Sequence, residues 1–437
     1  MTDLAADLDQ RLADAHARFV DRRPRSRAAH VEALIHLPGG NTRSVLHFDP
    51  FPYRVASADG AVQTDVDGFT YVDFCGNYTA GLFGQSEAVV RDAVVAAMDD
   101  GWAIGAVREQ EARLAALLCA RFPSLDQVRF TNSGTESNLM AIGTALHHTG
   151  RAGVLVFDKG YHGGVLSFGG AGVAGSPLNA PYAFTVADWN DAEAAVAAIE
   201  TEAFGCVLVE PVQGSGGCRV PSDDFLSALR EACSRTSTVL IFDEVMTSRL
   251  SPAGAQGRMG VTPDMTTLGK YFGGGMSFGA FGGSREIMAH YDGYAGGVLT
   301  QAGTFNNNAA SMAAAITVIE QLLTPEALAD VNERGDRLRA RLDDVFAVHA
   351  TPMTVTGMGS MLCLHADDPR HLELLFFDLV EQGLFVAPRG FMALSMSITD
   401  VHVDQLVTAI ERWARASGRA ARMNTPRTSR ATRLGPR

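Results

Sequence analysis

The chain has 437 residues, of which 46% are hydrophobic and 19% are charged, and its formal net charge at pH 7 is -13. This composition is typical of a soluble enzyme, and the length is sufficient for two domains. An acidic chain has no basic face to neutralise phosphates, which excludes general nucleic-acid binding. No apolar stretch reaches the length of a membrane span, and the acidic N-terminus does not resemble a signal peptide. The six cysteines lack metal-ligand spacing, so we expect no metal and a cytoplasmic protein with reduced thiols.

The N-terminal part of the sequence predicts a helix followed by a small meander of strands. Residues 3–22 carry apolar residues at helical spacing, and Pro24 is expected to end this helix. A strand pattern follows over residues 53–56 and 61–73, with Asp67-Gly68 as a hairpin turn. The 3.6-residue period of helices then appears over residues 86–99 and 107–121.

The middle of the chain, from about residue 125 to 300, alternates short apolar runs with helical segments. The candidate strands are residues 128–130, 154–157, 206–209, 239–242 and 279–282. Such alternation predicts an α/β fold in which a mostly parallel sheet lies between layers of helices.

The C-terminal part begins with a long helical run after residue 306 that is broken near Thr324-Pro325. Residues 353–400 alternate strand, helix, strand and strand, and residues 401–416 predict a final helix. We therefore expect a large domain over residues 76–320 and a smaller α+β domain built from residues 1–75 and 321–416. The last residues, 417–437, are rich in arginine and predict a disordered tail, with a functional basic arm as the alternative.

A strand end and a glycine-rich loop carry the main catalytic candidates. Asp243 follows four apolar residues that predict a strand buried on both faces, and ligands bind at such strand ends in open α/β sheets. Lys270 lies in a glycine-rich loop further along the chain. The pair suits pyridoxal 5′-phosphate (PLP), because a lysine amine makes the Schiff base and a carboxylate keeps the pyridine nitrogen protonated. The alternative is an Asp–Lys salt bridge at a domain edge.

The loop after residue 131 is a candidate anion site. Ser133, Gly134 and Thr135 open a predicted helix, where backbone amides and two hydroxyls can bind a phosphate. A helix cap in which Ser133 pairs with Glu136 fits the same residues.

Other candidate ligands lie after further strands or before the long helix. Glu210 and Gln213 occupy a glycine-lined turn and can hydrogen-bond a ring substituent, or serve only as satisfied loop groups. Tyr161 can stack on a planar cofactor, although packing is the commoner role of a lone tyrosine. Thr304 offers either a phosphate ligand or a helix N-cap.

Taken in order and spacing, these motifs resemble the class III aminotransferases of fold type I from about residue 30 to 415. The shared segments are residues 132–136, 161–163, 209–211, 242–245, 268–270, 273–275 and 303–305. The Pro38-Gly39-Gly40 start resembles the glutamate-1-semialdehyde aminomutase branch. Four further segments look most like the β-amino acid aminotransferases, such as those that act on β-phenylalanine, namely residues 246–250, 276–283, 306–308 and 388–391.

The resemblance implies PLP as the cofactor, a seven-stranded sheet and a homodimer whose active sites are shared between subunits. Lys270 would carry the cofactor and move a proton, Asp243 would pair with the ring nitrogen, and Gln213 would lie near the phenolic oxygen. The ring would lie between Val245 and Tyr161. The phosphate ligands implied are Gly134, Thr135 and Thr304 of the partner subunit.

Two arginines are candidate anchors for substrate carboxylates. Arg43 and Arg389 can each bind a carboxylate through a planar guanidinium, whereas an isolated arginine more often makes a structural ion pair. The β-amino acid aminotransferases that this chain resembles have an arginine at both positions. A β-amino acid carries its amine one carbon further from the carboxylate than an α-amino acid does. Two anchors can therefore bring either amine to the same atom.

Three apolar residues, Tyr78, Phe83 and Met276, are expected to line the pocket for the substrate side chain, with ordinary core packing as the alternative. One departure from the family pattern is Gly84-Gln85, where related chains carry Gly-His. That side of the pocket is expected to differ from the pocket of those relatives.

The sequence thus predicts a PLP-dependent aminotransferase with a ping-pong mechanism. The expected donor is a β-amino acid, with an aromatic one such as β-phenylalanine favoured, and the expected acceptor is a 2-oxo acid such as 2-oxoglutarate or pyruvate. The alternative is a glutamate-1-semialdehyde-type 2,1-aminomutase, an isomerase that needs no separate acceptor. A non-catalytic scaffold is disfavoured because both Lys270 and Asp243 are present.

Overall fold

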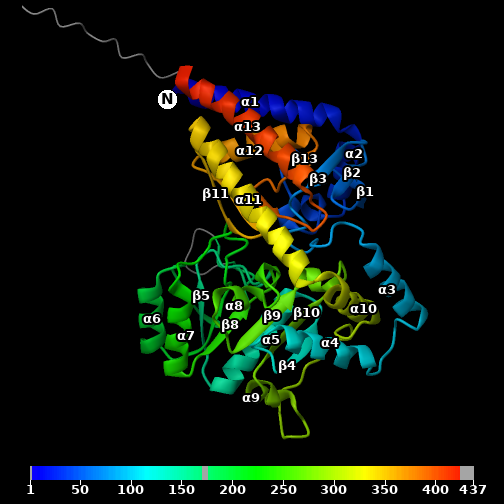
Figure 1. Ribbon diagram of the computed structural model, residues 1–437, viewed down its shortest axis with the longest axis vertical. Coiled ribbons are helices and arrows are strands. Elements are labelled where there is room, and N and C mark those ends of the chain that lie inside the picture. Colours follow the sequence, from blue (N-terminus) through cyan, green and yellow to red (C-terminus); the bar gives the residue numbers. More distant parts are fainter. Residues whose placement is uncertain (1, 170–175, 424–437) are drawn as a thin grey trace, which may run out of the picture.

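The computed structural model describes residues 2–169 and 176–423 of the chain. Figure 1 shows two bodies, one above the other. The lower body (residues 88–322) surrounds a large sheet with helices. The upper body combines residues 2–73 with residues 325–423, so the two ends of the described chain lie together (Figure 1).

A seven-stranded sheet forms the centre of the lower body, in the order β4-β10-β9-β8-β7-β5-β6. Only β10 runs antiparallel to its neighbours within this sheet, and the α/β fold predicted from the sequence is confirmed. The bounds are β4 Gln127–Thr131, β5 Gly153–Phe157, β6 Ala183–Ala187, β7 Phe204–Val209, β8 Val239–Asp243, β9 Met265–Gly269 and β10 Gly279–Gly283. Strands β7 to β10 are buried along their whole length, and apolar or small residues make up most of them.

Helices cover both faces of this sheet, as expected when parallel strands are joined by crossovers (Figure 1). The helices of the lower body are α3 Ala88–Asp99, α4 Glu109–Arg121, α5 Gly134–Thr149, α6 Ala192–Thr201, α7 Phe225–Thr236, α8 Gly254–Met259, α9 Arg285–Met288 and α10 Ala309–Thr317. Short helical turns follow several strands or helices: η3 Thr247–Leu250, η4 Lys270–Gly273, η5 Ala289–Tyr291 and η6 Val318–Leu322.

Two smaller sheets belong to the upper body. One has the order β1-β2-β3-β13, in which β13 from the C-terminal segment pairs with β3 from the N-terminal segment, and the other has the order β11-β12-β14. The strands are β1 Val55–Asp59, β2 Val62–Asp65, β3 Thr70–Asp73, β11 Met353–Met358, β12 Met361–Ala366, β13 Leu384–Phe385 and β14 Phe391–Ala393. The helices are α1 Thr2–Arg22, α2 Pro24–Leu34, η1 Pro38–Gly40, η2 Ser44–Leu46, α11 Pro325–His349, α12 Pro369–Glu381 and α13 Asp400–Met423.

Several boundaries differ from the sequence-based expectation. Helix α1 ends at Arg22 as expected, but Pro24 begins a second helix, α2, at a position where its missing N–H costs nothing. The segment after α11 contains an additional strand, β12, before α12. Helix α13 continues to Met423, beyond the predicted end at residue 416. The remainder of the predicted tail, residues 424–437, lies outside the described residues.

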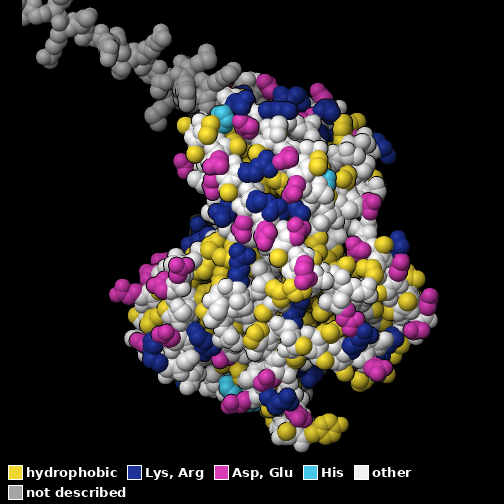
Figure 2. All heavy atoms as spheres, in the orientation of Figure 1, with side chains coloured by type: hydrophobic (Ala, Val, Ile, Leu, Met, Phe, Trp, Pro, Cys, Tyr) yellow, Lys and Arg dark blue, Asp and Glu magenta, His cyan; other side chains and the backbone are white. Residues whose placement is uncertain are grey.

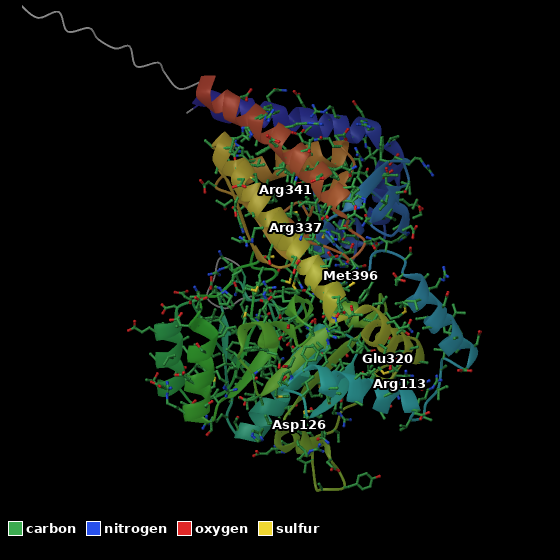
Figure 3. All side chains as sticks on the ribbon, in the orientation of Figure 1. Arg113, Asp126, Glu320, Arg337, Arg341 and Met396 are labelled. Atoms are coloured by element: carbon green, nitrogen blue, oxygen red, sulfur yellow. The ribbon has the colours of Figure 1, made fainter. Side chains whose placement is uncertain are left out.

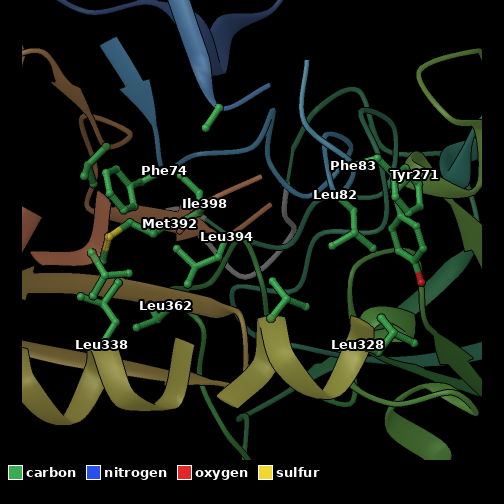
Figure 4. Packing of buried hydrophobic residues seen from close by; sticks show 14 of the residues in the cluster. Phe74, Leu82, Phe83, Tyr271, Leu328, Leu338, Leu362, Met392, Leu394 and Ile398 are labelled. Atoms are coloured by element: carbon green, nitrogen blue, oxygen red, sulfur yellow. The ribbon is translucent and has the colours of Figure 1, made fainter. Parts of the chain in front are cut away.

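One hydrophobic cluster runs through both bodies (Figure 4). Leu338 on α11 packs with Leu362 and Met392 of the upper body, and Tyr271 of the lower body belongs to the same cluster. Helix α11 spans the two bodies in Figure 1. The loops that follow β9 and precede β14 are therefore held on one continuous core.

Ion pairs join α11 to α13 on the outside of the upper body. Arg337 contacts Asp400 at 3.3 Å and Arg341 contacts Asp404 at 2.7 Å, and Figure 3 shows both arginines along α11. Such exposed pairs contribute little each to stability. In the described part of the chain, no single helix is long and apolar enough to cross a membrane. One bent pair of helices, 309–322 with 325–349, has the length and the apolar composition of a membrane span, and these two properties are the only ones that suggest one.

Candidate active site

The loops that follow β4, β5, β7, β8 and β9 meet at the carboxyl edge of the large sheet. A cavity of about 170 Å³ lies there. This is the place where ligands bind in open α/β folds. Its lining is Gly134, Thr135, Asn138, Tyr161, His162, Gly163, Glu210, Asp243, Val245, Met246 and Lys270.

Asp243, the last residue of β8, is held by three donors. His162 Nδ1 and Asn138 Nδ2 each lie 2.8 Å from Oδ2, and the backbone N–H of Val245 donates to Oδ1 at 3.0 Å. Thr267 in turn donates to the Oδ1 atom of Asn138 at 2.7 Å. The carboxylate is only 4% exposed. A buried carboxylate with this many donors has one fixed orientation, and it lines the cavity.

Lys270 begins η4 directly after β9 and lines the same cavity. Its φ of 54° is uncommon for a residue with a side chain and marks a backbone held by its surroundings. Burial lowers the pKa of its amine, while the charges of Asp243 and Glu210 act in the opposite direction. A lowered pKa favours the neutral amine, which is the nucleophilic form.

The start of α5 has the geometry expected of an anion-binding turn and lies beside the lysine. Ser133 caps the helix by accepting the N–H of Glu136 at 3.2 Å, and Glu136 accepts the N–H of Asn132 at 3.0 Å. The cap leaves room for an anion, because the amides of Gly134 and Thr135 precede the capped one. A Cβ on Gly134 would lie 2.7 Å from a methyl group of Val245, so glycine is required at this contact.

Glu210 and Gln213 are both engaged by protein groups, as in the satisfied-loop alternative, and only Glu210 lines the cavity. The carboxylate of Glu210 lines the cavity and accepts the backbone N–H groups of Tyr161 and Gly214, both at 3.1 Å, so it fixes the loop that carries Tyr161. Gln213 lines neither this cavity nor the neighbouring one. Its amide donates to the carbonyl of Asp158 at 2.7 Å and accepts from Arg219 at 3.1 Å.

A second cavity of about 880 Å³ shares Gly134 and Lys270 with the first. Its lining includes Arg43, Ser133 and all three predicted side-chain pocket residues, Tyr78, Phe83 and Met276. Phe83 is also core, since it is 7% exposed and contacts Tyr271, whereas Met276 is 39% exposed. Gln85 lines this cavity too, at the position where the sequence departs from the family pattern.

The two predicted arginine anchors meet at Tyr78. The guanidinium carbon of Arg43 lies 5.9 Å from the ring centroid of Tyr78, and that of Arg389 lies 5.4 Å from it. Arg43 donates to Asn77 Oδ1 at 2.8 Å, and Arg389 donates to Ser215 Oγ at 3.3 Å. Among the described residues, neither guanidinium has a carboxylate within 4.0 Å, so both positive charges remain available.

Three further residues lie outside the predicted site or were not predicted as part of it, namely Thr304, Asn138 and His162. Thr304 is exposed in the loop before α10 and lines neither cavity of its own chain. Asn138 and the function of His162 were not predicted. The signal available for Asn138 was its position four residues after Gly134, which places both on the same face of α5. For the described residues, no group of three or more metal-binding side chains exists.

The residues present fit PLP. A fixed carboxylate, a lysine with a lowered pKa and a helix start whose first amides are available lie around one cavity. These are the groups needed for a pyridine nitrogen, an aldehyde carbon and a phosphate.

Residues 46–413 match the family model described as aminotransferase class-III, so the chain belongs to the class III aminotransferases. This family uses PLP. The chain is 47% identical over 420 residues to the β-phenylalanine transaminase of Variovorax paradoxus, covering 93% of this chain and 96% of that protein. The structure of a β-phenylalanine aminotransferase from the same organism matches with a TM-score of 0.92 and 46% identity, covering 94% and 98% of the two chains.

A glutamate-1-semialdehyde 2,1-aminomutase of Lachnoclostridium phytofermentans is 34% identical over 403 residues, covering 85% of this chain and 94% of that protein. The chain is less similar to this aminomutase than to the β-phenylalanine transaminase, which favours the aminotransferase assignment over the aminomutase alternative. The chain is thus a PLP-dependent aminotransferase, as predicted from its motifs.

Proposed function

We propose that this aminotransferase moves the amino group of a β-amino acid, preferably an aromatic one such as β-phenylalanine, to a 2-oxo acid such as 2-oxoglutarate or pyruvate. The observation that carries the proposal is the pair Arg43 and Arg389, whose guanidinium groups share one aromatic ring and lack acidic partners in the described chain. The name of the Variovorax relative, a β-phenylalanine transaminase, supports the same substrate class.

The two halves of the reaction use the same residues in turn. When bound, PLP supplies an electron-withdrawing ring that stabilises negative charge on the carbon bearing the amine. Asp243 would hold a proton on the ring nitrogen, and the Lys270 amine would remove and return the proton at the reacting carbon. Gly134 and Thr135 would bind the phosphate, and Tyr161 and Val245 would lie on opposite faces of the ring.

Substrate length explains the need for two anchors. One arginine fixes a carboxylate at one distance from the lysine, whereas the donor and the acceptor differ by one carbon in that distance. Arg43 and Arg389 approach from different segments, before β1 and before β14, and can each grip one class. Phe83, Met276 and the Tyr78 ring would then contact the aromatic substituent.

The test is a steady-state assay of the PLP-loaded enzyme with β-phenylalanine and either 2-oxoglutarate or pyruvate. We expect parallel-line kinetics, and we expect Arg43→Ala and Arg389→Ala each to lower kcat/KM by about 100-fold for one of the substrates. Arg412→Ala, which removes an exposed arginine on α13, is the matched control and should leave the rates unchanged. Turnover of α-amino acids or simple amines alone would contradict the proposal.

We also propose that the enzyme is a homodimer in which the partner subunit's Thr304 completes the phosphate site. Large apolar side chains of the lower body are exposed, for example Trp102 at 65%, Val107 at 87% and Phe305 at 65%. Figure 2 shows hydrophobic side chains on the lower body, among charges of both signs. Sedimentation at micromolar concentration tests the dimer, and a monomer with full PLP affinity would contradict it. The cytoplasmic location expected from the sequence stays a prediction.

A further inference from the structure

An unusual turn supports the two arginine anchors. Four consecutive residues, Gly76 to Thr79, have positive φ angles of 52°, 47°, 53° and 77°. Residues with side chains adopt this left-handed conformation rarely and only where the surroundings impose it. A run of three of them beside a substrate cavity therefore points to a function of the turn.

A buried carboxylate holds the turn in place. Asp73 Oδ1 accepts the backbone N–H groups of Cys75 at 2.8 Å and Gly76 at 3.2 Å. Its Oδ2 accepts the amides of Gln63 at 2.8 Å and Gln85 at 2.6 Å. With its two oxygens shared among four donors, this 2%-exposed carboxylate fixes the direction in which the turn leaves β3.

The turn is also pressed against β14, the strand that follows Arg389. A Cβ on Gly76 would lie 2.5 Å from the carbonyl oxygen of Ala393, the last residue of β14. The Tyr78 ring lies nearly parallel to that of Phe391, with an interplanar angle of 20° and centroids 5.6 Å apart. The Tyr78 hydroxyl donates to the carbonyl of Val45 at 3.0 Å. The ring is thus fixed both to the segment after Arg43 and to the segment after Arg389.

Two like charges lie near this one ring. Arg43 and Arg389 lie 5.9 and 5.4 Å from the same ring centroid, and an aromatic face attracts guanidinium groups through its quadrupole. Asn77, the neighbour of Tyr78 in the turn, accepts the hydrogen bond of Arg43. One rigid turn therefore supplies both the ring and a polar contact.

We propose that Tyr78 is a positioning residue for both anchors: its ring, presented by the left-handed turn 76–79, sets the separation of the Arg43 and Arg389 guanidinium groups. This inference rests on the proposed function, in which each arginine binds one carboxylate. It assigns to Tyr78 a role in both half-reactions, beyond that of a wall for the aromatic substituent of the donor.

The test compares Tyr78→Phe, which keeps the ring, with Tyr78→Leu, which removes it, in the PLP-loaded enzyme. KM is measured for β-phenylalanine and for pyruvate, which has no aromatic group to contact a wall. We expect Tyr78→Leu to raise both KM values about fivefold, with a smaller change in kcat, and Tyr78→Phe, which keeps the ring and loses only the bond to Val45, to raise both by a smaller factor. If Tyr78→Leu does not fold, Tyr78→Met carries the same expectation, because methionine fills more of the space.

A rise in KM for β-phenylalanine alone would overturn the proposal, since it would reduce Tyr78 to a wall of the donor pocket. Equal losses in Tyr78→Phe and Tyr78→Leu would also overturn it, because the hydroxyl and not the ring would then be decisive. If the wild-type enzyme turned over neither substrate, the proposed function would fail together with this inference. Normal wild-type turnover with unchanged KM values in Tyr78→Leu would refute the inference alone.

Discussion

His162 Nδ1 lies 2.8 Å from Asp243 Oδ2, and both side chains are almost completely buried. The histidine comes from the loop after β5 and the aspartate from the end of β8, so their contact ties two loops of the site together. The carbonyl of His162 also accepts the amide of Asn138 at 3.0 Å. Asp243 is therefore oriented before any cofactor arrives.

We expect His162→Ala to weaken PLP binding by about tenfold or more, because a buried charged acceptor loses one of its donors. The measurement is the dissociation constant of PLP, obtained by titrating the cofactor-free enzyme. His36→Ala removes an exposed histidine and is the control. An unchanged PLP affinity in His162→Ala would show that Asn138 and the Val245 amide suffice to orient the carboxylate.

The role of Lys270 can be tested with unusual clarity, because Lys159 is the only other lysine in the sequence. Borohydride reduction of the PLP-loaded enzyme should label the peptide that contains Lys270. Lys270→Ala should lower turnover at least about 1,000-fold while circular dichroism stays that of the folded protein, since the amine moves the proton at the reacting carbon. Lys159→Ala is the matched control, and a label on Lys159 would refute the assignment.

Glu210 should make stability depend on pH in an unusual direction. Burial raises the pKa of its carboxyl from 4.5 to about 7, a rise that His162 opposes and Asp243 strengthens. The folded state therefore binds a proton that the unfolded state has released between about pH 4.5 and 7. Stability contributed by this group is present below pH 4.5 and decreases as the pH rises through this range.

In Glu210→Gln this contribution is absent, so the Tm of the variant relative to wild type should increase from pH 5 to pH 8. The measurement is calorimetry of the PLP-free enzyme, because a bound cofactor adds charges of its own. Glu202→Gln, an exposed carboxylate near the start of the same strand, should track wild type throughout. Parallel pH profiles for wild type and Glu210→Gln would show that Glu210 titrates normally.

Most strands of the large sheet could be predicted because they are short runs of apolar residues in the sequence, as in β5, β7 and β8. Strand β9 was not predicted, because Thr266 and Thr267 interrupt its apolar run. Both are completely buried, yet Thr266 shares a hydrogen bond with Ser124 at 2.7 Å and Thr267 donates to Asn138. Partners more than a hundred residues away satisfy these hydroxyls, and no local pattern reveals them.

In the site, too, local sequence indicates some features, whereas others depend on distant partners. Lys270 and Asp243 could be nominated from their chemistry and their places at strand ends, but a salt bridge fits the same pair, and only the other motifs in order favoured the catalytic roles. Gln213 was expected beside the cofactor, but Asp158 and Arg219 engage its amide elsewhere. Sequence spacing gave the turn on which Gln213 lies, whereas the direction of the side chain depends on partners from other loops.

Two glycines inside helices allow the effect of packing to be compared with the effect of helix propensity. Gly335 lies in the middle of α11, where an added Cβ would come within 2.1 Å of the carbonyl oxygen of Gly359, in the turn between β11 and β12. That oxygen belongs to the backbone and cannot rotate away. Gly143 lies inside α5, where the nearest atom to an added Cβ is the Tyr182 hydroxyl at 3.8 Å.

We therefore expect Gly335→Ala to lower the free energy of unfolding by about 1–3 kcal/mol, because α11 must move away from the upper sheet. Gly143→Ala should raise it by about 0.5–1 kcal/mol, since alanine is the better helix former and meets only ordinary contacts. Urea denaturation of both variants measures the difference. Because α11 connects the two bodies, Gly335→Ala should also impair binding of the substrate whose carboxylate Arg389 holds. Stabilisation by both substitutions would mean that the helix is free to shift at Gly335.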